Sequence, residues 1–154
     1  MKLIGDTGLP IQVLLVEDSP GDVRLTREAF QDANQAIELH VAQDGVEAMA
    51  FLNQEPPHGN APRPDLILLD LNLPRMDGRE VLARIKADAN LKTIPTIILT
   101  TSEAEADIVK SYQLQANAYV TKPVQLDEFE ELVRSINDFW LTRVTLPRDR
   151  KSVV

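Results

Sequence analysis

Five short apolar runs recur along the chain, and this recurrence limits the possible folds more than any other feature. They cover residues 11–16, 37–42, 66–69, 97–99 and 118–120. The first, third and fourth runs are almost continuous in Val, Ile and Leu. Such runs are typical of strands that are buried on both faces of a parallel sheet.

Helix signals fill the gaps between these runs. Ser19 (followed by proline), Asp44 and Asp77 each offer an N-cap, and Ser102 with Glu105 forms a capping box. Apolar residues spaced three or four apart follow each cap, and in the second helix this spacing predicts that Val46, Met49 and Ala50 face inward. Strands that alternate with helices predict right-handed βαβ crossovers and an α/β, flavodoxin-like (βα)5 doubly wound parallel sheet.

One domain accounts for most of the 154 residues. We expect it to span residues 11–140, with an N-terminal extension at 1–10 and a C-terminal tail at 141–154. Residues 55–64 hold four of the ten prolines and predict an extended surface loop. That loop could be inert or could serve recognition, and the sequence leaves both readings open.

Composition excludes several classes of function. The chain has no cysteine and only two histidines, so disulfides, thiolate metal sites and histidine-rich metal sites are not expected. It lacks an apolar run of about 18 residues and an apolar leader, which predicts a cytoplasmic protein that does not enter the membrane. A net charge of −8 argues against binding nucleic acid.

Polar residues follow the predicted strands where ligands bind in open α/β sheets, at the carboxyl ends. Glu17 and Asp18 follow the first run, Asp70 the third, Thr100 the fourth and Lys122 the fifth. Any one of them could be an ordinary polar strand end or helix cap. Because all five residues lie at the same edge of the predicted sheet, they predict a functional site there.

This set of residues suits phosphoryl transfer. Three clustered carboxylates repel one another and need a cation, and a few hard oxygen ligands suit Mg²⁺. Asp70 beside that ion can attack phosphorus as a carboxylate nucleophile and form an aspartyl phosphate. The Lys122 ammonium can neutralise the charge of the phosphoryl oxygens, and the Thr100 hydroxyl can donate a hydrogen bond to one of them.

The motifs together resemble a response-regulator receiver domain of the single-domain chemotaxis (CheY-like) type. They are the Glu17-Asp18 pair, LLDLNLPRMDG around Asp70, Thr100, and YVTKP around Lys122. The resemblance covers about residues 11–140, and it implies the strand order 2-1-3-4-5 of that fold. It also implies a phosphoprotein of a two-component phosphorelay.

The resemblance implies a role for each site residue. Asp70 accepts a phosphoryl group from a sensor histidine kinase. Glu17, Asp18, Asp70 and the backbone carbonyl of Asn72 hold Mg²⁺, and Lys122 pairs with the phosphoryl group. Only autocatalytic phosphorylation and dephosphorylation are expected, so the chain is not an enzyme in the usual sense.

Further implied roles concern the switch and the phosphoryl lifetime. Thr100 and Tyr119 form the switch pair, and a cis peptide is expected before Pro123. Asn72 and Ser102 occupy positions that influence the loss of phosphate. Two departures from the family pattern are the Glu-Asp pair in place of the commoner Asp-Asp, and Thr101 where a smaller residue is favoured.

The end of the chain predicts a dimer. The last helix, from about residue 125 to 141, is apolar on more than one face. The tail carries four basic residues and one acid, a net +3 that leaves −11 for the rest. DFWLTRVTLP and the Pro-rich insertion resemble the single-domain regulators that partner cyanobacterial and other bacterial phytochromes, in which the last helix and tail form a homodimer. The expected interface residues are Phe139, Trp140, Leu141, Val144 and Leu146.

Three other functions remain as alternatives. A phosphohydrolase of the haloacid-dehalogenase type also uses a strand-end Asp, but it needs a second Asp where this chain has Asn72. A pseudo-receiver that binds partners without phosphorylation is disfavoured by the presence of Asp70, Thr100 and Lys122 together. Nucleic-acid binding through the tail is disfavoured by the acidic body of the protein.

Overall fold

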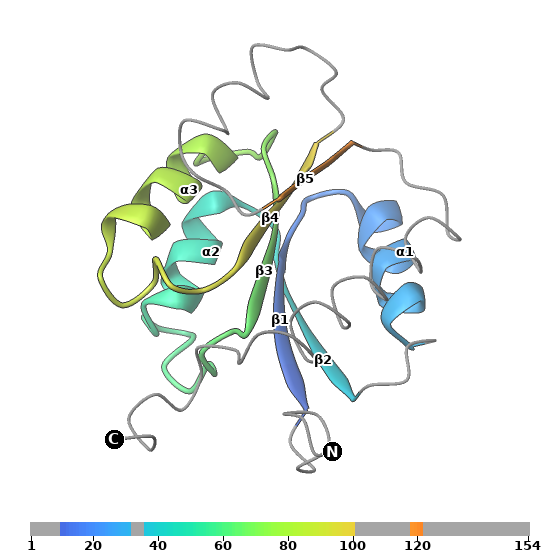
Figure 1. Ribbon diagram of the computed structural model, residues 1–154, viewed down its shortest axis with the longest axis horizontal. Helices are drawn as coiled ribbons and strands as arrows, with labels where there is room; N and C mark the ends of the chain where they lie inside the picture. The colour runs from blue at the N-terminus through green and yellow to red at the C-terminus, as the bar shows by residue number, and fades with distance from the viewer. Residues whose placement is uncertain (1–9, 32–35, 101–117, 122–154) are drawn as a thin grey trace.

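The computed structural model describes residues 10–31, 36–100 and 118–121. Five parallel strands form one sheet in the order β2-β1-β3-β4-β5 (Figure 1). This topology confirms the predicted flavodoxin-like sheet. The strands are β1 (Ile11–Val16), β2 (Ile37–Ala42), β3 (Leu66–Asp70), β4 (Thr96–Thr100) and β5 (Ala118–Thr121).

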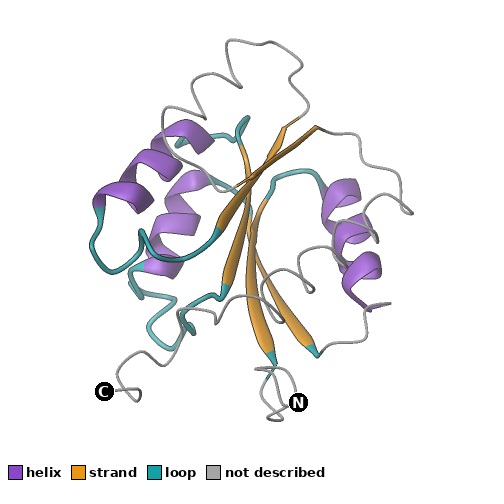
Figure 2. Ribbon diagram, viewed as in Figure 1, coloured by secondary structure: helices purple, strands orange, loops and turns teal. Residues whose placement is uncertain are grey.

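Helices cover both faces of the sheet. Helix α1 (Pro20–Gln31) lies on one face, and α2 (Gly45–Leu52) and α3 (Gly78–Ala87) lie on the other (Figure 2). This is the doubly wound arrangement. The helices predicted after Ser102 and over residues 125–141 lie outside the described residues.

Two apolar clusters explain why the strand sequences are almost continuously apolar. Alternate residues of the inner strands point to opposite faces, so each strand contributes to both clusters. On the α2 and α3 side, Leu14, Leu69 and Ile98 are fully buried. On the α1 side, Leu15 and Leu68 are equally buried.

Each predicted helix cap in the described residues is present. The Ser19 Oγ accepts a hydrogen bond from the Asp22 N–H at 3.3 Å at the start of α1. The Oδ1 of Asp44 accepts from the Glu47 N–H at 2.7 Å, and that of Asp77 accepts from the Arg79 N–H at 2.7 Å. These caps satisfy backbone donors that the first helical turns leave unpaired.

The inward face predicted for α2 is wrong at Val46, whereas Met49 packs against the buried cluster on this side of the sheet as predicted. Val46 is 39% exposed, while Gly45, Ala48 and Phe51 are buried. Gly45 and Ala48 face inward together with Phe51 and Leu52, because the first turn of α2 lies directly against Met76. Close packing at the helix start therefore sets the rotation of α2.

The Pro-rich segment is a surface loop with fixed attachments. The His58 ring packs on Phe51 with centroids 5.5 Å apart, and its Nε2 lies 3.7 Å from the Glu47 carboxylate. Arg63 donates from Nη1 to the Asn90 carbonyl at 2.6 Å. The loop is thus held against α2 at one end and against the α3–β4 connection at the other.

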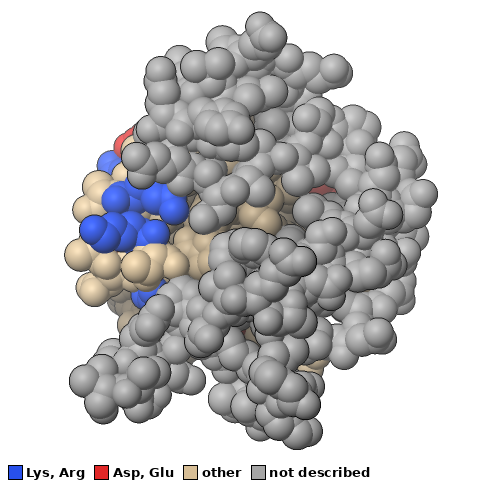
Figure 3. Space-filling view, viewed as in Figure 1, with Lys and Arg blue, Asp and Glu red and all other residues tan. Residues whose placement is uncertain are grey.

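Basic side chains lie together on one visible part of the described surface. Lys and Arg side chains gather over α3 on the face seen in Figure 3. The basic residues of this helix are Arg79, Arg84 and Lys86. Among the described helices, none combines the length and the apolar character needed to cross a bilayer.

Candidate functional site

The carboxyl ends of β1 and β3 bring three acidic side chains together. Val16 pairs with Leu69 in the parallel register, so the next residues, Glu17 and Asp70, lie side by side. Asp18 joins them, and one carboxylate oxygen from each of the three lies within 4.8 Å of the others. The sequence prediction of an acidic cluster at this edge is confirmed for these three residues.

Two of the three clustered carboxylates are buried, where water screens their mutual repulsion poorly. Glu17 is 1% exposed and Asp70 is 4% exposed, whereas Asp18 faces solvent. Backbone N–H groups donate to two of the carboxylates, from Ser19 to Glu17 Oε2 at 3.2 Å and from Asn72 to Asp70 Oδ1 at 3.1 Å. Adjacent buried anions repel strongly, so the site favours a bound cation.

The donor set fits a hard divalent cation. All three side chains offer carboxylate oxygens, which Mg²⁺, Ca²⁺ and Mn²⁺ prefer over nitrogen or sulfur donors. The exposed Asp18 leaves one side of the cluster open to solvent. An ion held there can keep water ligands or accept oxygens from an incoming group.

The loop after Asp70 is folded tightly onto the end of β3. The Gly78 N–H donates to the Leu71 carbonyl at 2.9 Å, which closes the loop. A Cβ on Gly78 would lie 2.1 Å from the Asp70 carbonyl oxygen, so only glycine allows α3 to begin this close to the end of β3. Sequence reasoning gave this glycine no such role, although the Asp-Gly dipeptide was a visible signal.

For the predicted residues Thr100 and Tyr119, the structure describes the position in the strands. Thr100 ends β4 and pairs with Thr121, and Tyr119 lies in β5 opposite Ile98. Asn72 is exposed just beyond Asp70. Several predicted residues lie outside the described part of the chain, namely Thr101, Ser102, Lys122, Pro123, Phe139, Trp140, Leu141, Val144 and Leu146.

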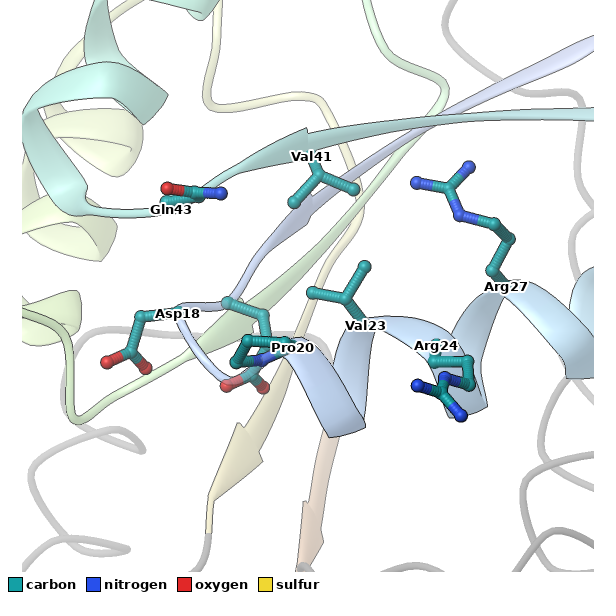
Figure 4. Close-up of a pocket in the computed structure, with 8 residues that line it drawn as sticks. Asp18, Pro20, Val23, Arg24, Arg27, Val41 and Gln43 are labelled. Atoms are coloured by element: carbon teal, nitrogen blue, oxygen red, sulfur yellow. The ribbon is translucent and has the colours of Figure 1, made fainter.

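A hollow of about 340 Å³ adjoins the acidic cluster between α1 and the end of β2 (Figure 4). Its acidic end is formed by Glu17 and Asp18, and two arginines of α1 lie farther along the helix. Sequence reasoning missed these arginines because they sit on a helix and not at a strand end. The full lining is Glu17, Asp18, Pro20, Val23, Arg24, Arg27, Val41 and Gln43.

Comparison with known proteins agrees with this geometry. The profile of the response regulator receiver domain matches residues 13–134. Response regulator Rcp1 of Synechocystis sp. is 51% identical over 138 residues, which cover 90% of this chain and 94% of Rcp1.

Solved structures agree as well. That of the phosphorylated cyanobacterial phytochrome response regulator RcpA has a TM-score of 0.82 at 50% identity, covering 90% of this chain and 99% of that one. The Mn²⁺-bound form of Rcp1 has a TM-score of 0.81 at 51% identity, with the same coverage of both chains. A divalent metal is therefore bound by a relative with half of its residues in common with this chain.

Proposed function

Because the chain belongs to the response regulator receiver domain family, we propose that its Asp70 accepts a phosphoryl group from a sensor histidine kinase. The protein is a receiver-type response regulator, and members of this family are signalling proteins and not classical enzymes. One observation carries the assignment of Asp70. Its buried carboxylate ends β3 within 4.8 Å of two other carboxylates.

In the proposed transfer, a carboxylate oxygen of Asp70 attacks the phosphorus of a phosphohistidine. The O–P bond forms while the P–N bond breaks, and the imidazole nitrogen leaves with the electron pair. The Asn72 N–H, 3.1 Å from Asp70 Oδ1, holds one oxygen and leaves the other as the nucleophile. A bound divalent cation supplies positive charge for the phosphoryl oxygens as the bonds exchange.

Mg²⁺ is the cation that we propose for this site. Glu17, Asp18 and Asp70 would hold it directly or through water, together with the backbone carbonyl of Asn72. Few protein ligands and an open side suit Mg²⁺, which retains several waters. The clustered carboxylates support this assignment, and the Mn²⁺-bound structure of Rcp1 supports a divalent ion in a relative.

Three further residues complete the proposed site from the family resemblance. Lys122 pairs with the phosphoryl group, and Thr100 and Tyr119 act as the switch. The backbone is consistent with the last two roles, because Thr100 ends β4 and Tyr119 lies on the neighbouring strand. Phosphorylation would thereby change the edge of the sheet formed by β4 and β5.

Repeated turnover of free phosphate esters is disfavoured by one residue. Asn72 stands two positions after Asp70 and is an amide, so it cannot act as the acid or base that a phosphohydrolase of the haloacid-dehalogenase type needs there. The aspartyl phosphate is therefore expected to persist until water or a partner removes it. This persistence is what a signalling switch requires.

A bacterial phytochrome is the sensor kinase that we propose as partner. The support is the similarity to RcpA, which is a cyanobacterial phytochrome response regulator, at 50% identity. Phosphoryl transfer from a phytochrome kinase should be faster than transfer from an unrelated histidine kinase at equal concentration. Equal rates from both kinases would refute this partner.

A homodimer formed through the C-terminal residues is the proposed assembly. Phe139, Trp140 and Leu141, followed by Val144 and Leu146, supply more apolar surface than one intramolecular face needs. Light scattering should therefore give the mass of two chains for the wild type and of one chain for Trp140→Ala. A monomeric wild type would refute the dimer.

The phosphoacceptor assignment is tested by mixing the protein with Mg²⁺ and acetyl phosphate and measuring the intact mass. We expect one added phosphoryl group in the wild type and none in Asp70→Asn. Continuous release of phosphate from several small esters would instead favour a phosphohydrolase. Absence of the added mass in the wild type would favour the pseudo-receiver.

A further inference from the structure

Helices α2 and α3 begin with the same dipeptide. Asp44-Gly45 and Asp77-Gly78 each supply the N-cap and then the first helical residue. Glycine is unfavourable in a helix, because it loses more backbone freedom on folding than other residues do. Neither glycine has the positive φ angle that would demand it. The space around each glycine must therefore explain its presence.

Both glycines allow a helix to begin against a backbone carbonyl. A Cβ on Gly78 would lie 2.1 Å from the carbonyl oxygen of Asp70 itself. A Cβ on Gly45 would lie 2.1 Å from the carbonyl oxygen of Met76 and 2.6 Å from the Met76 Cβ. Met76 belongs to residues 71–77, the loop that follows Asp70, and we call this segment the acceptor loop.

Asp44 contacts the acceptor loop as well as capping α2. Its Oδ1 accepts from the Glu47 N–H at 2.7 Å, and its Oδ2 lies 3.5 Å from Arg75 Nη1. Arg75 has a φ of 68°, a conformation that few non-glycine residues adopt. The beginning of α2 therefore holds the acceptor loop by a close contact and by an ion pair.

The acceptor loop in turn fixes groups at the acidic cluster. Asn72 donates its N–H to Asp70 Oδ1, and the Gly78 N–H returns to the Leu71 carbonyl. The loop thus lies between the start of α2 on one side and Asp70 on the other. A shift of the loop away from Gly45 would move the Asn72 backbone relative to the Asp70 carboxylate.

We propose that Asp44 and Gly45 are positioning residues, which set the geometry of Asp70 and of the cation site through the acceptor loop. This inference rests on the proposed function of Asp70. Neither residue belongs to the acidic cluster. Together they make the β2–α2 junction a support for chemistry that takes place at the ends of β1 and β3.

Gly45→Ala tests the close contact. Ordinary contacts to a Cβ are 3.4–4 Å long, so the added methyl group must displace the acceptor loop or α2. The readouts are Mn²⁺ affinity by electron paramagnetic resonance and, without metal, the NMR shift of the Asn72 amide. We expect Mn²⁺ binding to weaken about tenfold, as for other changes that misorient metal ligands, and the amide to shift.

Two glycines provide matched controls. Gly21 lies in the first turn of α1, near the acidic cluster, and its Cβ would meet only the Ser19 Oγ at 3.9 Å. Gly59 lies in the Pro-rich loop with nothing within 4 Å of its Cβ position. Gly21→Ala and Gly59→Ala should both keep the wild-type Mn²⁺ affinity. The inference is wrong if folded Gly45→Ala binds Mn²⁺ as the wild type does.

Asp44→Asn tests the ion pair and replaces the first variant if Gly45→Ala does not fold. Asparagine keeps the N-cap but removes the charge opposite Arg75. Mn²⁺ binding should weaken about two- to fivefold, the range for loss of a surface ion pair. Arg84→Gln, which breaks the pair with Glu80 on the outside of α3, should not alter it.

The outcomes separate this inference from the proposed function. If the wild type fails to bind Mn²⁺ and to accept phosphate, the proposed function itself is wrong. If the wild type does both, and Gly45→Ala and Asp44→Asn match it, only the positioning role is refuted. If Gly21→Ala weakens binding as much as Gly45→Ala, the effect is general to helix glycines and the positioning role is again refuted.

Discussion

Removal of one charge from the acidic cluster should stabilise the metal-free protein. In Asp70→Asn, the neutral amide replaces a buried carboxylate beside the buried Glu17 at a site where the carboxylate oxygens lie within 4.8 Å. Two unit charges at that distance repel by about 3.5 kcal/mol at an effective dielectric constant of about 20. The N–H donors of Ser19 and Asn72 are among the contacts that already offset part of this repulsion. We therefore expect a net gain of about 1–2 kcal/mol in the free energy of unfolding.

The same substitution should remove the response of the protein to metal. A cation that binds only the folded state stabilises it by about 2.7 kcal/mol at a concentration of 100 times its dissociation constant. Wild type should thus be the less stable protein in EDTA, and Mg²⁺ should stabilise it much more than it stabilises Asp70→Asn. Asn at position 70 can still accept the hydrogen bond from Asn72, so the loop geometry is preserved.

Urea unfolding in EDTA and in excess MgCl₂ measures both effects. Asp88→Asn is a suitable control, because this half-buried carboxylate caps the turn after α3 and lies outside the acidic cluster. The reasoning is refuted if Asp70→Asn is less stable than wild type in EDTA. It is also refuted if Mg²⁺ stabilises both proteins equally.

Three further predictions concern packing and burial. Gly78→Ala should abolish phosphorylation and destabilise the protein, because the added Cβ would collide with the Asp70 carbonyl. A variant that shows wild-type phosphorylation by intact mass would contradict this. Ile98→Ala should lower the free energy of unfolding by about 2–5 kcal/mol, since this side chain is fully buried in the central sheet; a loss below 1 kcal/mol in urea unfolding would contradict the packing described. Burial lowers the pKa of Lys86, so its charged form costs stability that is regained as pH rises through the lowered pKa toward 10.5. Lys86→Met should therefore be more stable than wild type at neutral pH by a margin that shrinks as the pH rises toward 10.5, and a margin that grows with pH would contradict this.

The strands and the acidic cluster could be predicted because they depend on local patterns. Residues such as Leu68 and Leu69 face opposite sides of the sheet and are both fully buried, so a continuous apolar run was enough to indicate a central strand. Because the predicted sheet is parallel, Glu17, Asp18 and Asp70, which directly follow its strands, are expected to meet at its carboxyl edge. These inferences required no knowledge of distances.

The contacts of Gly45 and Gly78 near the site could not be predicted, because they join segments that are distant in the sequence. Gly45 and Gly78 look like ordinary Asp-Gly turns in the sequence, and only the folded chain places their missing Cβ atoms against Met76 and Asp70. The inward face of α2 was misjudged for the same reason. Val46 is the larger apolar residue, but the contact at Gly45 determines how the helix is rotated.

The most direct test of the account is to identify the phosphorylated residue. The protein is treated with acetyl phosphate and Mg²⁺, then with borohydride, which reduces an aspartyl phosphate to homoserine, and its peptides are sequenced by mass spectrometry. The account predicts homoserine at position 70 and at no other position. Homoserine at another aspartate, or a phosphorylated protein with Asp70 unmodified, would contradict it.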